Sequence, residues 1–383
     1  MSSSSCSRAA RSAGTQPGAS VESAAASGGG DTGAPATTGV GAGGGAGRLG
    51  RDAGCRHAIS IRSVASRLMD RRYALTATPG YSAAMATAVI DIGTNTLLLL
   101  IVDDRMKPLV DLCRFGRLGK GLDASGRLAV ESIAASLDIC REYRQVMDAA
   151  GVSAPIIVGT QALREAANSQ DFVAPAQEIL GAPIEVIAGE REAQLAFISV
   201  ARTFPELAQA PYVVVDVGGG STEIIVSNGT KVVSAVSLPI GAVRLTERHL
   251  KHDPPTSDET RALFADIDGR LAQLELPAAV PVVATAGTAT TLAAMALRLD
   301  RYDAVAVTGL RLEAMAVDAQ LARLLTATTA ARRAIRGMEP QRADVIAGGV
   351  AILARVMHRI DAPVMITCDR GVRWGLAYEN AAG

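Results

Sequence analysis

One short pattern occurs twice in the 383-residue chain and limits its architecture more than any other feature. An apolar run reaches Asp91, a short turn with a glycine and hydroxyl side chains follows, and a second apolar run begins at Leu97. The same order returns 125 residues later, where an apolar run reaches Asp216 and another resumes after Glu223. The gap between the runs is too short for a helix, so each copy predicts a strand–turn–strand hairpin. Two hairpins predict two related halves, each with its own sheet.

Both turns carry the groups that an anion site needs. Glycines let backbone N–H groups approach an anion closely and adopt positive φ, and successive N–H groups in a turn form a concave anion site. The candidate phosphate-binding residues of the two turns are Gly93, Thr94, Asn95, Thr96, Gly218, Gly219, Gly220 and Ser221. The carboxylates beside them can hold Mg²⁺, which then bridges to phosphate oxygens. A single Asp-x-Gly turn is often only a hairpin corner, but two copies between apolar runs favour a clasp around a phosphate chain.

A third glycine turn follows the apolar segment 282–285. Gly287 and Thr288 precede an Ala- and Leu-rich segment that reads as a helix to Leu297, and a helix N-terminus is a further candidate anion site. The uncharged window 276–297 contains two prolines and several threonines. It is therefore too polar and too broken for a membrane span, and a buried strand that leads into a helix explains it better.

Composition excludes several classes of protein. Lys and Arg number 38 against 38 Asp and Glu, and aromatic residues make up 3%, which argues against a nucleic-acid-binding protein. The five cysteines form no Cys-x-x-Cys pair, which fits the reducing cytoplasm better than a disulfide framework or a zinc site. The sequence has no Gly-Lys-Ser or Gly-Lys-Thr, which a P-loop would need.

Residues 1–84 have a different composition from the rest of the chain. They are rich in Gly, Ser and Ala, and they contain nine arginines, no lysine and four acidic residues. Such a segment predicts a disordered low-complexity extension, because it cannot bury enough apolar surface to offset its ordering entropy. Two alternatives stay open: an organelle transit peptide, and a start codon placed too far upstream, since Met85 directly precedes the first predicted strand.

From residue 85 onward the sequence resembles the exopolyphosphatase/guanosine pentaphosphate phosphohydrolase (Ppx/GppA) family of the actin-like, sugar-kinase and Hsp70-like superfamily. Several blocks carry the resemblance, and their number and order make it specific. The blocks span 90–96, 117–122, 159–166, 187–193, 215–223, 238–245, 285–288, 342–344 with Gly348 and Gly349, and 370–373.

The resemblance implies an α/β protein with two RNase H-like lobes, each a mixed sheet flanked by helices, and an active cleft between them. We expect the first lobe at 85–190, with 371–383 as a segment that returns to it, and the second lobe at 191–370. Compared with longer relatives, the chain resembles a short form that lacks a C-terminal helical domain. Ala-rich helical patterns at 128–150 and 320–336 fit this class.

The resemblance also implies residue roles. Glu192 matches the catalytic glutamate that acts as base on water, and Arg164, placed early in its helix, matches an arginine near the phosphate. Asp216 and Glu223 match the acids that hold a divalent metal, Mg²⁺ or Mn²⁺, and Asp91 would hold water around it by pseudo-symmetry. Arg191 interrupts the acids before Glu192, so either Glu190 or Glu192 could face the water.

Four other positions have weaker interpretations. Arg370 and Arg373 either line the cleft or pair with acids. His249 and His252 are spaced like a helical metal pair, but the sequence offers no clear third ligand and the neighbours are basic, so we expect them at the surface.

The implied activity is hydrolysis of the terminal phosphate of inorganic polyphosphate in the cytoplasm, without nucleic-acid or membrane partners and with a homodimer left open. The nearest alternative is removal of the 5′ γ-phosphate of guanosine pentaphosphate by the same residues. A sugar-kinase-like activity is suggested only by the glycine pair in 346–349, and the blocks around Glu192 and Arg244 speak against it. A non-catalytic sensor of polyphosphate or (p)ppGpp is the fourth hypothesis, and intact acidic turns speak against it.

Overall fold

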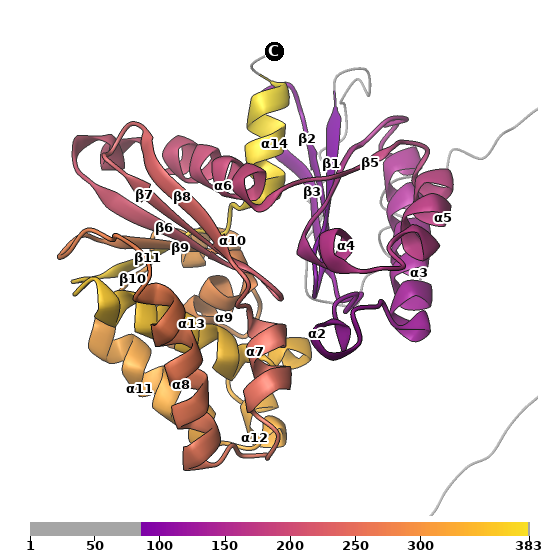
Figure 1. Ribbon diagram of the computed structural model, residues 1–383. Helices are drawn as coiled ribbons and strands as arrows, with labels where there is room; N and C mark the ends of the chain where they lie inside the picture. Colours follow the sequence, from indigo (N-terminus) through magenta and orange to yellow (C-terminus); the bar gives the residue numbers. More distant parts are fainter. Residues whose placement is uncertain (1–85, 382–383) are drawn as a thin grey trace, which may run out of the picture. The chain divides into compact units, whose positions relative to one another are not determined.

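Two mixed β-sheets organise the part of the chain that the computed structural model describes, residues 86–381 (Figure 1). These residues fall within one unit of the chain, His57–Gly383. The expectations for residues 1–84 lie outside the described residues.

The first sheet has the strand order β3-β2-β1-β4-β5. Its strands are β1 (Thr87–Ile92), β2 (Leu97–Val102), β3 (Pro108–Arg114), β4 (Ile156–Gly159) and β5 (Ile184–Val186). The first three strands form an antiparallel meander, and β4 and β5 add to it in parallel. The first predicted hairpin, with Asp91 near the end of β1, is therefore confirmed.

Helices cover both faces of this sheet, which explains why β1 and β2 are apolar at almost every position. Alternate residues of β1 face opposite ways. Ile90 and Ile92 pack in one core with α3 (Val130–Ala149) and α5 (Gln170–Leu180). Val89 packs in a second core with α14 (Val372–Asn380) on the other face. Figure 1 shows α14 beside β1 and β2, which lie far from it in the sequence.

The second sheet has the strand order β10-β11-β9-β6-β7-β8. Its strands are β6 (Tyr212–Val217), β7 (Thr222–Ser227), β8 (Val232–Leu238), β9 (Val282–Thr285), β10 (Arg311–Leu312) and β11 (Met365–Thr367). The strands β6, β7 and β8 repeat the antiparallel meander of the first sheet, and β9 pairs with β6 in parallel as β4 pairs with β1. The predicted repeat of the fold is therefore present as two sheets with the same core pairing.

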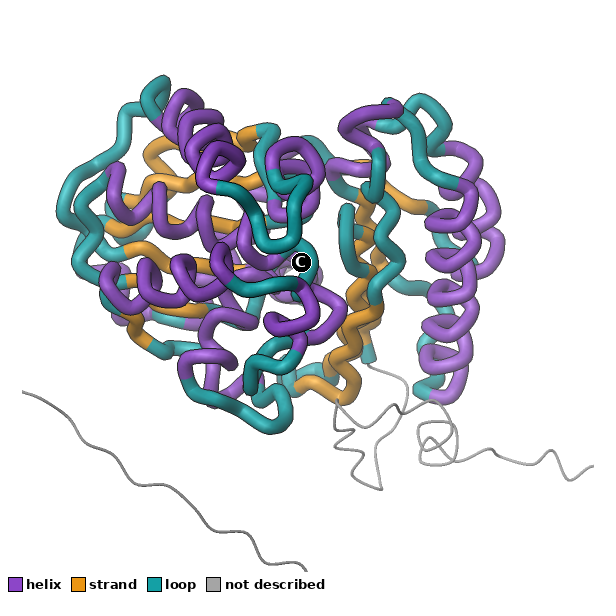
Figure 2. Tube along the Cα trace, turned by 90° about the horizontal axis from the view of Figure 1, so that it is seen from below, coloured by secondary structure: helices purple, strands orange, loops and turns teal. Residues whose placement is uncertain are grey.

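One face of the second sheet carries most of its helices. That face packs against α7 (Ala242–His249), α8 (Ser257–Leu271), α9 (Ala286–Ala296), α11 (Ala314–Thr326) and α13 (Ile346–Arg359). Its other face packs against α6 (Gly189–Thr203), which also contacts α14. Figure 2 shows the helices gathered around the strands of each sheet. The predicted fold class, two mixed sheets flanked by helices, is confirmed, and the lobe boundaries at 190 and 370 stay predictions.

Short helices complete the connections. They are α2 (Leu122–Ser125), α4 (Gln161–Glu165), η2 (Pro205–Gln209), α10 (Ala304–Val307), α12 (Thr329–Arg333) and η3 (Pro340–Arg342). No described helix combines the length and the apolar character needed to cross a bilayer. The window 276–297 forms β9 and α9, as expected.

The helix predicted at 128–150 is present as α3, but the one predicted at 320–336 is wrong in its extent. The chain breaks between α11 and α12, where Ala327 is extended and the Thr328 side chain accepts a hydrogen bond from the Ala331 N–H as an N-cap. Threonine competes for backbone hydrogen bonds, so a threonine cluster favours a new helix start over continuation.

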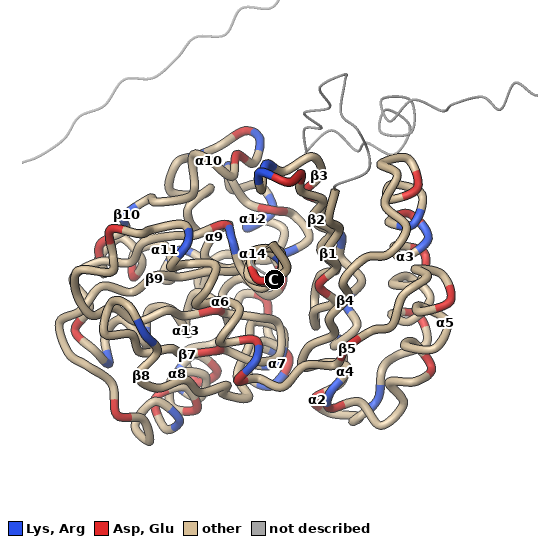
Figure 3. Tube along the Cα trace, turned by 90° about the horizontal axis from the view of Figure 1, so that it is seen from above, with Lys and Arg blue, Asp and Glu red and all other residues tan. Residues whose placement is uncertain are grey.

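Charged positions of both signs are intermixed on the elements of both sheets in Figure 3. This distribution agrees with the equal numbers of acidic and basic residues in the chain.

Candidate active site

A pocket of about 750 Å³ lies where the two hairpin turns and the start of α9 meet. Most of the predicted site residues line it. They are Asp91, Gly93, Thr94, Asn95, Thr96, Glu192, Asp216, Gly218, Gly219, Ser221, Glu223, Gly287 and Thr288. The described lining does not include Gly220 or Arg164.

The two turns close in the same way. The Gly93 N–H donates to the Thr96 carbonyl at 2.9 Å, and the Gly218 N–H donates to the Ser221 carbonyl at 3.0 Å. The turns also touch each other, because a Cβ atom on Gly219 would lie 2.9 Å from the Thr94 Cβ. Glycine is therefore needed at 219 for close approach.

The expectation of positive φ at these glycines is wrong. The positive-φ glycines of the described chain lie elsewhere, at 121, 126, 151, 181, 229, 309 and 337. The turn glycines are needed for space, not for a left-handed backbone.

Three buried carboxylates face the pocket from the two hairpins. Burial, and then the nearby Asp216 carboxylate, raise the pKa of Asp91 to about 7, although Arg373 opposes the shift. Burial also raises the pKa of Asp216, although the nearby Thr285 side chain opposes the shift. The pKa of Glu223 lies well above its ordinary value because of burial and the neighbouring carboxylates, although Ser237 donates to it at 2.7 Å. A bound cation would relieve the repulsion between these carboxylates and would stabilise their ionised forms.

The residues present fit a hard divalent cation. The Asp91 Oδ1 atom is buried and has no hydrogen-bond partner within residues 86–381. Among the described residues no three His, Cys, Asp or Glu side chains cluster tightly enough to form a complete metal site. Mg²⁺ commonly takes only one or two carboxylates and completes its shell with water and phosphate oxygens, so carboxylates beside an anion-binding turn suit it.

Glu192 lies in the first turn of α6, and 6% of it is exposed. Arg164 donates a hydrogen bond to its Oε2 atom and another to the Ile187 carbonyl at 2.7 Å. Burial raises the pKa of Glu192 to about 7, and Arg164 opposes that shift. Of the two glutamates that could face the attacking water, Glu192 lines the pocket and Glu190 is exposed.

Arg164 differs from its predicted placement. It lies in the last turn of α4, a five-residue helix, and not early in a longer one. Its guanidinium is engaged by Glu192 behind the pocket lining. A direct contact between Arg164 and phosphate stays a prediction.

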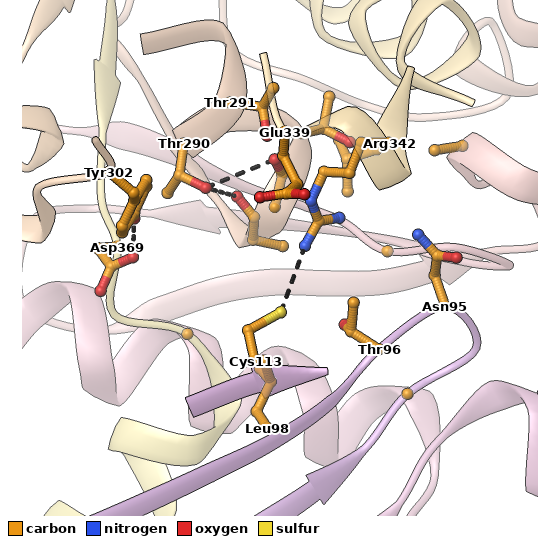
Figure 4. Close-up of a pocket in the computed structure, with 18 of the residues that line it drawn as sticks. Asn95, Thr96, Leu98, Cys113, Thr290, Thr291, Tyr302, Glu339, Arg342 and Asp369 are labelled. Carbon is orange, nitrogen blue, oxygen red and sulfur yellow. Dashed lines mark hydrogen bonds between the residues drawn. The ribbon is translucent and has the colours of Figure 1, made fainter. Parts of the chain in front are cut away.

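A polar network around Arg373 also lines the pocket, and Arg373, which was expected either to line the cleft or to pair with acids, does both. Arg373 donates to both oxygens of Asp111 at 3.0 Å and to Asp369 at 3.2 Å, and Tyr302 donates to Asp369. Figure 4 shows Tyr302 and Asp369 together at one side of the close-up. The sequence signal for Asp111 is a carboxylate between two apolar residues inside a strand, where a buried charge needs a partner.

Arg342 belongs to the segment 342–344 that carries part of the family resemblance, and no role was assigned to it from the sequence. A Cβ atom added to Gly287 would lie only 2.1 Å from the guanidinium carbon of Arg342, so this side chain covers the start of α9. The guanidinium also stacks over the Phe115 ring, 5.0 Å from its centroid. Figure 4 shows Arg342 pointing toward Cys113, with the two side chains 3.9 Å apart.

Three other flagged residues have structural partners. Arg370 stacks over the Trp374 ring at 4.3 Å, and it is not among the described lining residues, unlike Arg373. The surface assignment is right for His252 and wrong for His249, whose side chain is 16% exposed. His249 lies 2.9 Å from Asp266, which anchors it against α8.

The sequence pattern of the Ppx/GppA phosphatase family matches residues 99–382. The chain belongs to the Ppx/GppA phosphatase family. A curated relative, exopolyphosphatase 2 of Mycobacterium tuberculosis, is 36% identical over 289 residues, which cover 71% of this chain and 90% of that protein. The guanosine-5′-triphosphate,3′-diphosphate pyrophosphatase of Vibrio cholerae is 30% identical over 299 residues, which cover 76% of this chain and 58% of that protein.

Solved structures of Ppx/GppA proteins are similar over nearly their whole length. The crystal structure of the Aquifex aeolicus family member has a TM-score of 0.66 and 30% identity, and the match covers 78% of this chain and 98% of that one. This Ppx/GppA chain is therefore a member of a phosphatase family of hydrolases, and its particular substrate is a separate question.

Proposed function

We propose that this Ppx/GppA protein is an exopolyphosphatase, which uses a divalent metal to hydrolyse the terminal phosphoanhydride bond of inorganic polyphosphate. One observation carries the proposal: the buried Glu192 carboxylate shares a pocket with the paired acidic turns at Asp91 and Asp216. The match to nearly the full length of exopolyphosphatase 2 supports the choice of substrate.

The two turns and the start of α9 would bind the terminal phosphate through backbone N–H groups and the hydroxyls of Thr94, Ser221 and Thr288. Asp91, Asp216 and Glu223 would hold Mg²⁺ or Mn²⁺, directly or through water. The metal, when bound, supplies positive charge that neutralises phosphate oxygens.

Glu192 would accept a proton from the attacking water. The water oxygen forms the new bond to phosphorus, the bridging P–O bond breaks, and the products are inorganic phosphate and a chain shorter by one unit. A positioned carboxylate base typically contributes on the order of 10²–10⁴-fold to such a step. Arg164 would hold that carboxylate in place through its hydrogen bond.

The second candidate is the 5′-phosphohydrolase reaction on guanosine pentaphosphate, and one observation favours it. The pocket lining also includes Asp111, Asp300, Asp303, Glu339 and Asp369, as well as arginines. Carboxylates can accept hydrogen bonds from the N–H groups of a guanine base and from a ribose hydroxyl, which polyphosphate lacks.

The test is phosphate release from polyphosphate and from guanosine pentaphosphate, measured side by side with Mg²⁺, with Mn²⁺ and with a chelator. The proposal expects metal-dependent release with a higher kcat/KM on polyphosphate. A higher kcat/KM on guanosine pentaphosphate would establish the second candidate. Tight binding of either compound without release would instead indicate a sensor.

A further inference from the structure

Gln161 lies between the two hairpin turns, although neither the family resemblance nor the pocket lining assigns it a role. It is the first residue of α4, directly after β4, and 2% of it is exposed. The Thr94 hydroxyl donates to its Oε1 atom at 2.8 Å. Gln161 therefore holds a hydroxyl of the first turn from behind.

The same carboxamide lies against the second turn. A Cβ atom on Gly220 would lie 1.7 Å from Oε1 and 2.5 Å from Cδ of Gln161. The next glycine, Gly219, would meet Thr94 in the same way. The pair of Thr94 and Gln161 thus fills the space between the two turns, and any side chain at 220 would displace it.

The hydrogen bonds at this junction are incomplete. The Gln161 Nε2 atom is buried and has no hydrogen-bond partner in the described part of the chain. A hydroxyl has one proton, and here the Thr94 proton is committed to Gln161. In this arrangement the Thr94 hydroxyl can only accept a hydrogen bond from the pocket side. A phosphate oxygen is also an acceptor, so the two cannot hydrogen-bond.

We propose that Gln161 is a positioning residue that sets the direction of the Thr94 hydroxyl. The oxygen and nitrogen of a carboxamide are assigned from its hydrogen bonds, and a half-turn about its last bond exchanges them; the buried Nε2 atom, which has no partner among residues 86 to 381, favours the exchanged orientation. The Nε2–H then donates to Thr94 Oγ1, and the Thr94 proton turns to a phosphate oxygen. No covalent bond changes in this step, and the buried donor gains a partner.

This inference rests on the proposed function, because it assigns the first turn to the terminal phosphate. That phosphate is common to polyphosphate and guanosine pentaphosphate. The contribution of Gln161 is therefore the same for both substrates, and it also applies to inorganic phosphate bound in the pocket.

A double-mutant cycle tests the proposal with Gln161→Met, Thr94→Val and the double variant. Both single changes keep approximate size and remove hydrogen bonding. Each protein is assayed for kcat and KM on both substrates and for the Kd of inorganic phosphate by calorimetry. Gln170→Met, at an exposed site on α5, is the matched control.

We expect each single variant to lower kcat/KM about tenfold on both substrates and to weaken phosphate binding, in the range of one lost hydrogen bond to a charged group. The double variant should fall within about twofold of Thr94→Val, because Gln161 acts through Thr94. Multiplicative losses would overturn the proposal, since they would mean that Gln161 acts independently of Thr94.

Gln161→Glu supplies a second, independent check. An ionised carboxylate accepts the Thr94 proton but cannot donate one back. Because burial raises the pKa of a carboxyl group, this variant is assayed across the pH range. At high pH we expect its kcat/KM to be no better than that of Gln161→Met, and a wild-type value there would overturn the assigned carboxamide orientation. Thermal melts identify any variant that fails to fold.

The phosphate-binding measurement distinguishes a failure of the proposed function from a failure of the proposed role of Gln161. If the wild type releases phosphate from neither substrate but binds inorganic phosphate, the proposed function fails and the four Kd values still decide the role of Gln161. If the wild type releases phosphate but does not bind inorganic phosphate measurably, the four kcat/KM values decide the role of Gln161. If it neither releases phosphate from either substrate nor binds inorganic phosphate, both ideas are overturned.

Discussion

The Arg164 guanidinium donates a hydrogen bond to the Glu192 carboxylate and so joins the last turn of α4 to the first turn of α6. The second bond of Arg164, to the Ile187 carbonyl, anchors the guanidinium to the segment between β5 and α6. The arginine comes from a helix that follows β4 of the first sheet, whereas α6 packs on the second sheet. The orientation of the proposed base therefore depends on both sheets.

Without the hydrogen bond from Arg164, the Glu192 carboxylate should lose its orientation, and activity should fall. We expect Arg164→Ala to reduce kcat by about 10–100-fold, a part of what a positioned base contributes. Arg164→Lys should retain more activity, because the charge remains while the two directed bonds do not. Arg191→Ala is the matched control, since Arg191 pairs with Glu379 away from the pocket lining. Equal losses in the Arg164→Ala and Arg191→Ala variants would contradict the assigned role.

The same contact predicts a pH effect. Glu192 works as a base only when ionised, and its pKa is about 7, so kcat/KM should rise with pH through about 7 and then level off. Arg164 lowers that pKa, so its removal should move the rising limb to higher pH. A rising limb that stays in place in Arg164→Ala would show that another group controls it.

The Asp91 carboxyl group should lower the free energy of unfolding at pH values at which it is ionised in the folded protein. Its pKa is raised from 3.8 to about 7 in the folded protein, so the folded state is penalised as pH rises from about 4, and the penalty is complete above about 7. We expect Asp91→Asn to increase the free energy of unfolding of the metal-free protein by about 2 kcal/mol at pH 8, and by little at pH 4. Chemical denaturation at both pH values measures this, and an equal effect at both would contradict the burial of a charge. Glu190→Gln, at an exposed acid, is the control.

Asp266 should behave in the opposite way. Burial works against its charge, but hydrogen bonds from His249, Arg270 and Arg248 lower its pKa to about 2. Its stabilisation is therefore present above about pH 4 and is lost as pH falls toward 2. We expect Asp266→Asn to lose about 1 kcal/mol at pH 7, allowing for solvent screening, and the difference from wild type to shrink below pH 4. A difference that persists at pH 2 would mean that packing, not charge, is responsible.

The acids of the second turn predict a metal effect. Asp216→Asn removes a charged oxygen next to the phosphate-binding turn, so it should raise the Mg²⁺ concentration for half-maximal activity by about tenfold or more. Titration of Mg²⁺ at saturating substrate measures this. An unchanged midpoint with reduced kcat would place Asp216 outside metal binding.

The hairpins were predictable because both their chemistry and their spacing are local. An apolar run, an acid, a glycine turn and a second apolar run leave few structures open, and the repeat at Asp216 indicates that the two copies serve one site. Their convergence on one pocket was expected from the two copies themselves, and the family resemblance implied the same arrangement. The turn glycines allow close approach without positive φ, and phosphate binding by these residues stays a prediction.

The remaining features depend on tertiary contacts that no local pattern encodes. Arg373 and Asp111 are 262 positions apart, and they meet only because α14 packs beside the first sheet. The partner of Arg164 depends on where α6 begins, and the burial of His249 depends on how α8 packs against α7. The helix break at Thr328 was locally encoded by a threonine cap, but helical periodicity on both sides obscured it.

The most direct test of the account compares Glu192→Gln with Glu190→Gln in phosphate release from polyphosphate, together with polyphosphate binding measured by calorimetry. Both glutamates belong to the first turn of α6, but only Glu192 lines the described pocket. We expect Glu192→Gln to bind polyphosphate normally and to lose about 10²–10⁴-fold in kcat, while Glu190→Gln stays near wild type. A Glu192→Gln protein that releases phosphate at the wild-type rate would contradict the account.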